Sequence, residues 1–321
     1  MSARVAVLST SYPRQPGDAA GHFVATEVRR LAQAGHDVHV FAPGTGPASA
    51  DGAQLHWLGD GGAFGWPGAL TRLKQKPTRV LGASAFVIRA LRALRRSGPF
   101  ARVHAHFLLP CAWPIALFAA GSELELVGHG SDVRLFCALP TALRAHIARA
   151  WLARAAQIRV TSAELCELLG RSNPELTTSL RVAASPLDVS GAPSRGEARR
   201  ALGWDDQPRA LVVSRLIPGK CVATALEALT LLEGVHAVVV GDGPELSALR
   251  ARFPAVQFTG RLPRPEALRW IAAADVLVSA SPEEGAPSVV REARALGVRV
   301  VTVRAGELPA WAARDPGIRL I

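Results

Sequence analysis

The chain has 321 residues, which is long for one hydrophobic core and predicts two domains of about 150 residues each. Hydrophobic residues make up 49% of it and aromatic residues 6%, which indicates an α/β protein and excludes a disordered chain. The net charge of +11 comes almost entirely from arginine, since Lys74, Lys76 and Lys220 are the only lysines, and it favours anionic partners.

The cysteines and the apolar segments indicate a cytoplasmic protein. No C-x-x-C pair is present, which disfavours a zinc site and a disulfide framework. The N-terminus reads as a strand and not as a signal peptide, and the most apolar run, Phe107–Ala120, is too short to cross a bilayer.

The first half alternates strands and helices. A strand at Arg4–Thr10, a helix at Phe23–Ala34 and a strand at Asp37–Ala42 form a βαβ unit, so the strands are expected to be parallel. The other elements predicted here are a helix at 80–96, a strand at Arg102–Ala105, a helix from Pro110, a strand at Leu124–Val127, a helix at Thr141–Arg154, a strand at Gln157–Val160 and a helix at Ala163–Leu169.

The periodicity fails between Arg181 and Trp204, where Ser, Pro and Gly cluster, and we place the domain boundary there, giving domains 1–187 and 188–321. The alternation then resumes with strands at Ala210–Val213, His236–Val240, Val256–Thr259, Val276–Ser279 and Val300–Val303, and with helices at Cys221–Leu232, Pro244–Arg252 and Pro265–Ala273. Two such arrays predict two doubly wound, Rossmann-like domains facing across a cleft, with ligands at the carboxyl ends of the strands.

The stretch SPEEGAPSVVREARALG, residues 281–297, predicts a helix with Pro287 near its first position and Gly297 at its end. The start of a helix favours phosphate groups. A carboxylate is a poor neighbour for a diphosphate unless it accepts hydrogen bonds from hydroxyls. Glu284 and Glu292 therefore fit a nucleotide sugar, which carries hydroxyls on both sides of its diphosphate; the alternative is two surface glutamates.

Arg215 and Lys220 follow a strand of the same domain and are expected at the same edge of its sheet. An arginine fork and a compact ammonium both suit a diphosphate. The alternative is a pair of solvated cations. Because Lys220 is the only lysine after residue 76, a binding role is favoured.

The segment Glu284–Glu292 resembles the E-G-x-P-x-x-x-x-E signature of the retaining nucleotide-sugar glycosyltransferases of family 4, which have the GT-B fold. Other segments match that family in its order and spacing: Tyr12-Pro13 to Gly21, Gln33–His36, His104–His106, His129–Asp132, Ser214–Lys220, Gly241–Glu245, Phe258–Leu262 and Ala273–Asp275.

The resemblance implies a role for each matching residue. Arg215 and Lys220 would neutralise the donor diphosphate, Glu284 would bind the transferred sugar, and Glu292 would bind the ribose. The remaining implied donor contacts are the helix start at Gly285, Ala286, Pro287 and Ser288, the turn at Arg261 and Leu262 beside the base, and Gly21, where the first loop would pass the phosphates.

In the first domain, the resemblance places His129 at the transferred sugar, as the catalytic partner of Glu284, although a lone histidine could instead belong to the core. His106 and Asp132 are weaker candidates for the acceptor side, as is His104. The implied reaction retains configuration by attack on the same face and needs no metal or cofactor, because fixed cations and a helix dipole stabilise the leaving group. The implied acceptor is a glycan or a lipid-linked sugar.

The chain departs from the family in three places. Ala184–Asp188 replaces the usual Asn-Gly-Val-Asp turn, the Gly-Gly loop is reduced to Arg304–Glu307, and the sequence ends where the family continues with further C-terminal helices, which we therefore expect to be lacking. These departures leave an alternative, a catalytically impaired nucleotide-sugar-binding or partner subunit. A nicotinamide-dependent oxidoreductase is disfavoured because no G-x-G-x-x-G follows the first strand.

Residues Phe86–Arg96 predict a basic amphipathic helix. Its apolar stripe would be Val87, Leu91 and Leu94, and its basic stripe Arg89, Arg92 and Arg96. Such a helix suits an anionic membrane surface and a lipid-linked acceptor, with the protein peripheral at the inner face of the membrane. The alternative is that the leucine stripe packs into the domain. Nucleic acid is disfavoured because aromatic residues do not accompany the arginines.

Overall fold

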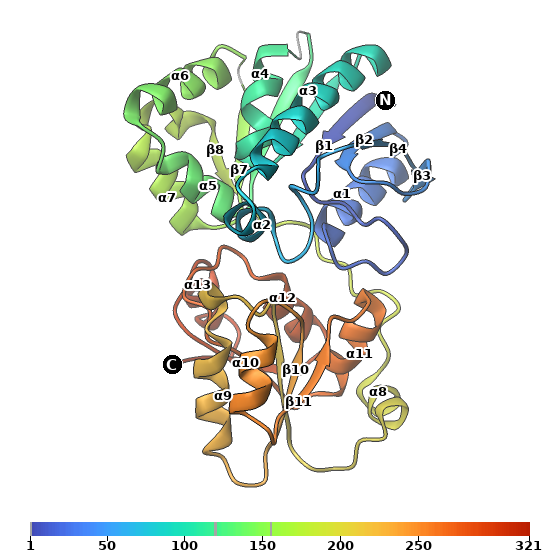
Figure 1. Ribbon diagram of the computed structural model, residues 1–321, viewed down its shortest axis with the longest axis vertical. Coiled ribbons are helices and arrows are strands. Elements are labelled where there is room, and N and C mark those ends of the chain that lie inside the picture. The colour runs from blue at the N-terminus through green and yellow to red at the C-terminus, as the bar shows by residue number, and fades with distance from the viewer. Residues whose placement is uncertain (1, 119–120, 155) are drawn as a thin grey trace. The chain divides into compact units, whose positions relative to one another are not determined.

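The computed structural model describes residues 2–118, 121–154 and 156–321. The chain forms two compact units, Met1–Pro186 and Leu187–Ile321 (Figure 1), whose boundary lies one position before the predicted one. The last two residues of the apolar run at 107–120 lie outside the described part. Among the residues described, no helix is both long enough and apolar enough to cross a membrane.

The first unit is built on an eight-stranded sheet of order β3-β4-β2-β1-β5-β6-β7-β8. Its strands are β1 (Arg4–Leu8), β2 (Asp37–Pro43), β3 (Ser49–Ala50), β4 (Ala53–Leu58), β5 (Arg102–His106), β6 (Glu123–Gly128), β7 (Gln157–Val160) and β8 (Leu180–Val182). Every pair is parallel except the short β3–β4 pair. The parallel βαβ prediction is confirmed, whereas β3, β4 and β8 were not foreseen.

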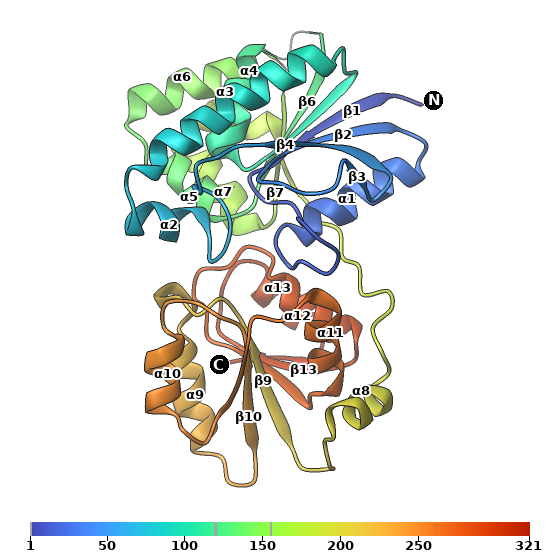
Figure 2. The ribbon, with the colours of Figure 1, turned by 45° about the vertical axis from the view of Figure 1, so that its right-hand side comes forward.

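Helices cover both faces of this sheet (Figure 2). They are α1 (His22–Gln33), α2 (Ala69–Gln75), α3 (Arg79–Ser97), α4 (Trp113–Phe118), α5 (Ser131–Cys137), α6 (Thr141–Leu152) and α7 (Ala163–Ser172), with short helical turns at Leu108–Ala112 and Pro174–Ser179. Alternate residues of β1 enter different cores: Val5 and Val7 pack under α1, while Ala6 and Leu8 join the larger core. This alternation is the strand period of two, with both faces buried.

Helix α3 buries the apolar stripe that had been considered for a membrane. Leu94 is buried, and Val87 and Leu91 pack against the core of the unit. The alternative that this stripe packs into the domain is therefore confirmed for these three residues. The 3.6-residue period identified an apolar face correctly, but the sheet of the same unit covers that face.

The second unit is built on a parallel six-stranded sheet of order β11-β10-β9-β12-β13-β14. Its strands are β9 (Arg209–Val213), β10 (His236–Val240), β11 (Gln257–Gly260), β12 (Val276–Ser279), β13 (Arg299–Thr302) and β14 (Ile318–Leu320). Its helices are α8 (Arg195–Leu202), α9 (Val222–Thr230), α10 (Leu246–Arg252), α11 (Arg264–Ala273), α12 (Ser288–Ala295) and α13 (Leu308–Ala312), with a short turn, η3, at Pro218–Lys220. The chain moves outward from β9 to β11 and then returns to place β12 on the other side of β9. The direction of winding thus reverses between β9 and β12, the position where doubly wound sheets bind ligands.

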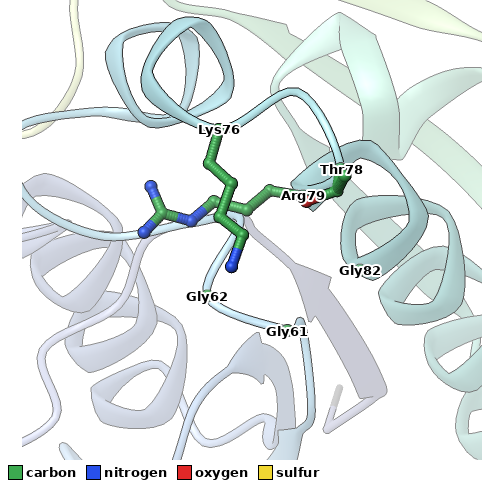
Figure 3. A pocket seen from close by; sticks show the side chains of 6 residues that line it. All are labelled: Gly61, Gly62, Lys76, Thr78, Arg79 and Gly82. Carbon is green, nitrogen blue, oxygen red and sulfur yellow. The ribbon is translucent and has the colours of Figure 1, made fainter.

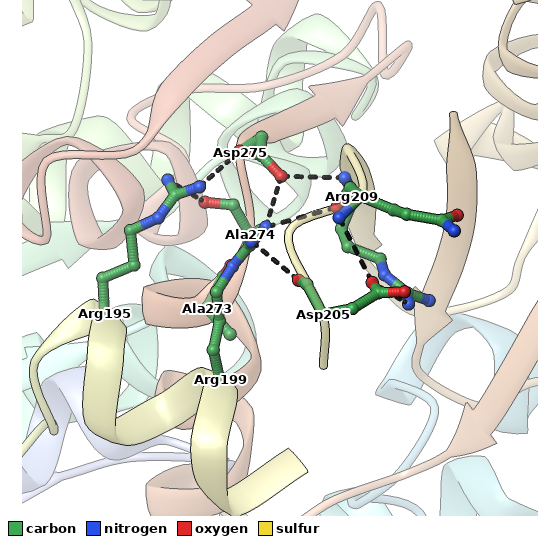
Figure 4. A network of polar contacts seen from close by, with 8 residues as sticks. Arg195, Arg199, Asp205, Arg209, Ala273, Ala274 and Asp275 are labelled. Atoms are coloured by element: carbon green, nitrogen blue, oxygen red, sulfur yellow. Dashed lines mark hydrogen bonds and ion pairs between the residues drawn. The ribbon is translucent and has the colours of Figure 1, made fainter. Parts of the chain in front are cut away.

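A polar network fixes the opposite edge of this sheet, where β9 and β12 begin (Figure 4). Asp275 accepts hydrogen bonds from the backbone N–H of Arg209 at 2.8 Å and from Arg199 Nη2 at 2.7 Å, and it pairs with Arg195. Arg195 and Arg199 lie on α8, which starts with a capping box formed by Ser194 and Glu197. The network thereby joins α8 to both central strands.

We expect Asp275→Ala to lower the free energy of unfolding by about 1–2 kcal/mol. The change removes the hydrogen bonds that Asp275 accepts from the Arg209 N–H and from Arg199, whereas the ion pairs are partly exposed and contribute less. Burial raises the pKa of Asp275, but the Arg209 amide and the two guanidinium groups outweigh this effect and hold the pKa below its usual value. The contribution is therefore present above about pH 4, the unfolded pKa, and is lost as pH falls through the folded pKa.

Urea unfolding at several pH values measures this difference. The exposed neighbour Asp206, changed to Ala, serves as the control. Equal stability of the Asp275 and Asp206 variants at pH 7 would contradict the assignment of the network.

Candidate functional site

The second unit brings a cation and a carboxylate together at its winding reversal. Lys220, in the loop after β9, forms an ion pair with Glu284, in the loop after β12, and its Nζ lies 3.5 Å from Ser281 Oγ. Each side chain of the pair keeps 17% of its surface exposed. Two residues 64 positions apart thus meet because parallel strands end at the same edge of the sheet.

The turn after β10 supports the loop that carries Lys220. The N–H of Leu216 donates to the carbonyl of Asp242 at 2.9 Å, which joins the two loops. A Cβ on Gly241 would lie 1.8 Å from the Ser214 carbonyl oxygen, so only glycine allows this approach. The Gly-Asp-Gly turn is therefore needed for packing between loops.

Arg215 contributes a second cation next to the pair. Burial lowers the pKa of its guanidinium, and the negative charge of Glu284 acts in the opposite direction. A buried cation is stabilised by nearby negative charge. The loop after β9 thus holds two positive groups close to one carboxylate.

Helix α12 begins immediately after Glu284–Pro287. Pro287 is its N-cap residue and not its first helical residue, and among the described residues no side chain caps this end. At the other end, Gly297 N–H donates to the carbonyl of Arg294 and Val298 N–H to that of Ala293, which is a Schellman motif. The predicted end of the helix at Gly297 is confirmed.

The loop after β13 holds the backbone of Glu284 and Gly285 in place. The N–H of Glu307 donates to the Gly285 carbonyl at 2.9 Å. Gly306 has a φ of 49°, and a Cβ there would lie 2.1 Å from the Gly285 carbonyl oxygen and 2.5 Å from that of Glu284. The short Arg304–Glu307 loop therefore fixes the position of Glu284.

Glu292 is 5% exposed and is held by Arg264, a residue that the sequence analysis missed. Arg264 Nη1 lies 2.7 Å from Glu292 Oε1, and its Nη2 donates to the Asp188 carbonyl at 2.6 Å. Arg264 opens α11 directly after the predicted turn at Arg261 and Leu262. The position of Arg264, at the ligand edge of the sheet, is the feature of the sequence that could have identified it as a site residue.

The first unit places His129 beside His106, with His106 Nδ1 and His129 Nε2 3.0 Å apart. Asp132 has both oxygens occupied by backbone groups: its Oδ1 accepts from the N–H of His129 and of Gly130, and its Oδ2 from that of Leu108. Asp132 is buried and holds the loop that carries His129, and its assignment to the acceptor side stays a prediction. His106 is 1% exposed, and its assignment to the acceptor side likewise stays a prediction.

Two aromatic rings flank His129. The centroids of Phe23 and Phe107 each lie 4.7 Å from that of His129. Phe107 has a φ of 71°, which is strained for a bulky residue and is found mainly where surrounding structure enforces it. The strained residue directly follows β5, next to the histidine.

Gly21 has a φ of 66°, and a Cβ there would lie 2.3 Å from the Ser11 carbonyl oxygen. The glycine is thus required by the packing of the first loop on itself. Its approach to phosphates stays a prediction.

A pocket of about 280 Å³ lies beside the segment that joins α2 to α3, at the start of α3 (Figure 3). Its walls contain none of the predicted site residues: they are Gly61, Gly62, Lys76, Thr78, Arg79 and Gly82. Within residues 2–118, 121–154 and 156–321, no group of three or more His, Cys, Asp or Glu side chains is arranged to hold a metal ion.

Two family models match the chain, one in each unit. The model described as "Glycosyltransferase Family 4" matches residues 20–175, and the model described as "Glycosyl transferases group 1" matches residues 207–318. Each of these models describes a glycosyltransferase region.

Related proteins agree with the family models. A GDP-mannose-dependent alpha-mannosyltransferase of Mycobacterium tuberculosis is 30% identical over 94% of this chain and 79% of its own length. A putative teichuronic acid biosynthesis glycosyltransferase, TuaC, of Bacillus subtilis is 31% identical over 64% of this chain, and the match spans only about half (53%) of the TuaC sequence.

Among solved structures, a sucrose-phosphate synthase from Thermosynechococcus elongatus superimposes with a TM-score of 0.75 at 19% identity, over 100% of this chain and 86% of its own. This likeness establishes the GT-B fold, with two α/β units. Given this fold, the two family models and the extent of the match to the mycobacterial enzyme, the chain belongs to the glycosyltransferases.

Proposed function

We propose that the protein transfers a hexose-type sugar from a nucleotide diphosphate sugar to a glycan or lipid-linked acceptor, with retention of configuration and without a metal. The observation that carries this proposal is the Lys220–Glu284 pair at the winding reversal, next to the start of α12. This arrangement places three groups close together at one edge of the sheet: a cation, a carboxylate that can accept hydrogen bonds from hydroxyls, and the positive end of a helix dipole.

The donor diphosphate would replace Glu284 as the partner of Lys220. A diphosphate carries more negative charge than one carboxylate, and the start of α12 adds a partial positive charge. Because burial lowers the pKa of Arg215, a second anion nearby would favour its charged form. Once Lys220 pairs with phosphate, the Glu284 carboxylate is available to accept hydrogen bonds from the transferred sugar.

The nucleoside would lie beside Glu292 and the turn at Arg261 and Leu262. Arg264 holds Glu292 through Oε1 and is itself anchored to the Asp188 carbonyl, so the carboxylate has a fixed position. We propose that it accepts hydrogen bonds from the ribose hydroxyls.

In the proposed reaction the acceptor oxygen bonds to the anomeric carbon on the face from which the diphosphate departs. The bond from the anomeric carbon to the phosphate oxygen breaks, and the proton of the acceptor hydroxyl moves to the departing phosphate. Arg215, Lys220 and the dipole of α12 would stabilise the charge that develops there. We propose that His129 of the first unit contacts the sugar.

A transfer assay with GDP-, UDP- and ADP-sugars tests the proposal, beginning with GDP-mannose because of the name of the mycobacterial relative. We expect Glu284→Gln to lower kcat/KM by about 100-fold or more, since it removes a group that acts on the reacting sugar. The adjacent exposed Glu283, changed to Gln, should stay within about twofold.

Thermal shift separates binding from turnover, because a bound donor raises the Tm. A donor that stabilises the wild-type chain without any transfer or hydrolysis would overturn the proposal and support a binding or partner subunit.

The contact at Gly306 generates a second prediction. Gly306→Ala should reduce transfer by about 10-fold or more, because its Cβ would displace the Glu284–Gly285 backbone. Gly297→Ala is a matched control: its φ of 78° is equally unfavourable, but a Cβ there meets no atom within 4 Å. It should lose about 1 kcal/mol of stability and keep its activity. Equal activities of the two variants, measured well below their Tm, would refute the role of the loop.

We also propose that the acceptor is reached at an anionic membrane surface. Leu81 and Ile88, seven residues apart on α3, are 73% and 49% exposed, and the arginines at 92 and 95 are exposed on the same side of the helix. The basic pocket of Figure 3, with Lys76 and Arg79, lies at the beginning of this helix. These residues, and not the buried stripe, would contact lipid.

Flotation with vesicles of phosphatidylglycerol and phosphatidylcholine measures this binding. Changing Leu81 and Ile88 together to Glu should reduce the bound fraction about 10-fold. Leu231→Glu, at a leucine of the second unit that is 83% exposed, should not. Binding that is independent of anionic lipid would refute the membrane proposal and leave the transferase proposal intact.

A further inference from the structure

A group of charged residues contacts His106, the histidine that lies beside His129. Glu27, on α1, is 7% exposed, and its Oε2 accepts from Arg159 Nη2 at 2.6 Å. The other oxygen of Glu27 lies 3.0 Å from His104 Nδ1 and 3.5 Å from His106 Nε2. Glu27 therefore faces both histidines of β5.

A second carboxylate completes the group. Glu125 pairs with Arg159 at 2.7 Å and with Arg181 at 2.7 Å, so two carboxylates are balanced by two guanidinium groups. Burial raises the pKa of Glu27, but His106, His104 and Arg159 outweigh this effect and hold the pKa well below its usual range. Glu27 is thus a carboxylate, which accepts hydrogen bonds and cannot donate one.

The position of Glu27 decides where the protons of the two imidazoles lie. His106 Nε2 is buried and makes no hydrogen bond in the structure, and the nearby charge is the Glu27 carboxylate at 3.5 Å, which favours a proton over a lone pair on this nitrogen. In a neutral His106 ring with its proton on Nε2, Nδ1 has a lone pair and accepts from His129 Nε2, 3.0 Å away, in rings that are nearly parallel at 10°. Burial lowers the pKa of His129 well below its usual value, which agrees with a neutral imidazole at His129.

We propose that Glu27, acting through His106, is a positioning residue that fixes His129 as the Nε2–H tautomer. His129 Nδ1 then carries a lone pair, in a ring whose centroid lies 4.7 Å from those of Phe23 and Phe107, and accepts a hydrogen bond from a substrate hydroxyl. Within the described residues no group donates to or accepts from this nitrogen. The identity of the hydroxyl rests on the proposed function; the tautomer does not.

The chain itself provides the first test. In protein labelled with ¹⁵N-histidine, NMR at neutral pH distinguishes a protonated from a bare ring nitrogen, and His129→Gln identifies the signals. We expect His129 with a protonated Nε2 and a bare Nδ1. A protonated Nδ1 on His129 in the wild-type chain would overturn the inference, whether or not any variant folds.

Glu27→Gln supplies the second test. Arg159 needs an acceptor at the former Oε2, so the substituted amide would direct its NH₂ toward His106 Nε2. His106 would then carry its proton on Nδ1 and donate to His129, which switches to the Nδ1–H tautomer. The surface residue Glu123, whose side chain is 78% exposed, is the control when changed to Gln.

We expect the switch only in the Glu27 variant, with a fall of about 10-fold in kcat/KM for transfer. A natively folded Glu27→Gln variant with an unchanged His129 tautomer would refute the role of Glu27. Absence of transfer by the wild-type chain would instead refute the proposed function and leave the tautomer result valid.

Discussion

The ion pair between Lys220 and Glu284 is the interaction on which the second unit's site depends. It joins the loops that follow β9 and β12, at the one place where the winding of the sheet reverses. The other features of this edge support it: Gly241 lets the β10 turn pack on the β9 loop, and Gly306 lets the β13 loop pack on the Glu284 backbone. A charged pair that is only 17% exposed on each side is costly to separate unless a ligand supplies a replacement charge.

Each unit contains a buried carboxylate that is held by an arginine. Arg264 holds Glu292 in the second unit, and Arg159 holds Glu27 in the first. In each case the arginine makes a further contact, to the Asp188 carbonyl or to Glu125, so the carboxylate is fixed in position as well as in charge. Fixed carboxylates suit a protein that handles hydroxyl-rich sugars, because they accept hydrogen bonds without rearrangement.

Much of the fold was predictable from the alternation of strands and helices. That Lys220 and Glu284 lie at the same edge of the sheet was predictable from their positions after two strands of one domain. Composition did not point to Arg264 or Arg159, because arginine is so abundant here that no single one stands out; only the position of Arg264 after a predicted ligand-edge turn was a signal. Glu27 lies in an amphipathic helix, where a glutamate usually faces solvent. Its partners are 77 and 132 positions away, and only the folded sheet brings them together. Helix α8 was missed because its short, arginine-rich sequence lies in a segment dense in Ser, Pro and Gly.

The scarcity of lysine has a practical consequence for chemistry on this protein. Lys220 is the only lysine of the second unit, and 17% of its side chain is accessible. An aldehyde or activated ester that reacts with amines therefore has one side-chain target in that unit, located at the ion pair itself. A covalent probe that reacts with amines would therefore label this site at Lys220, whereas the arginines beside it would not react.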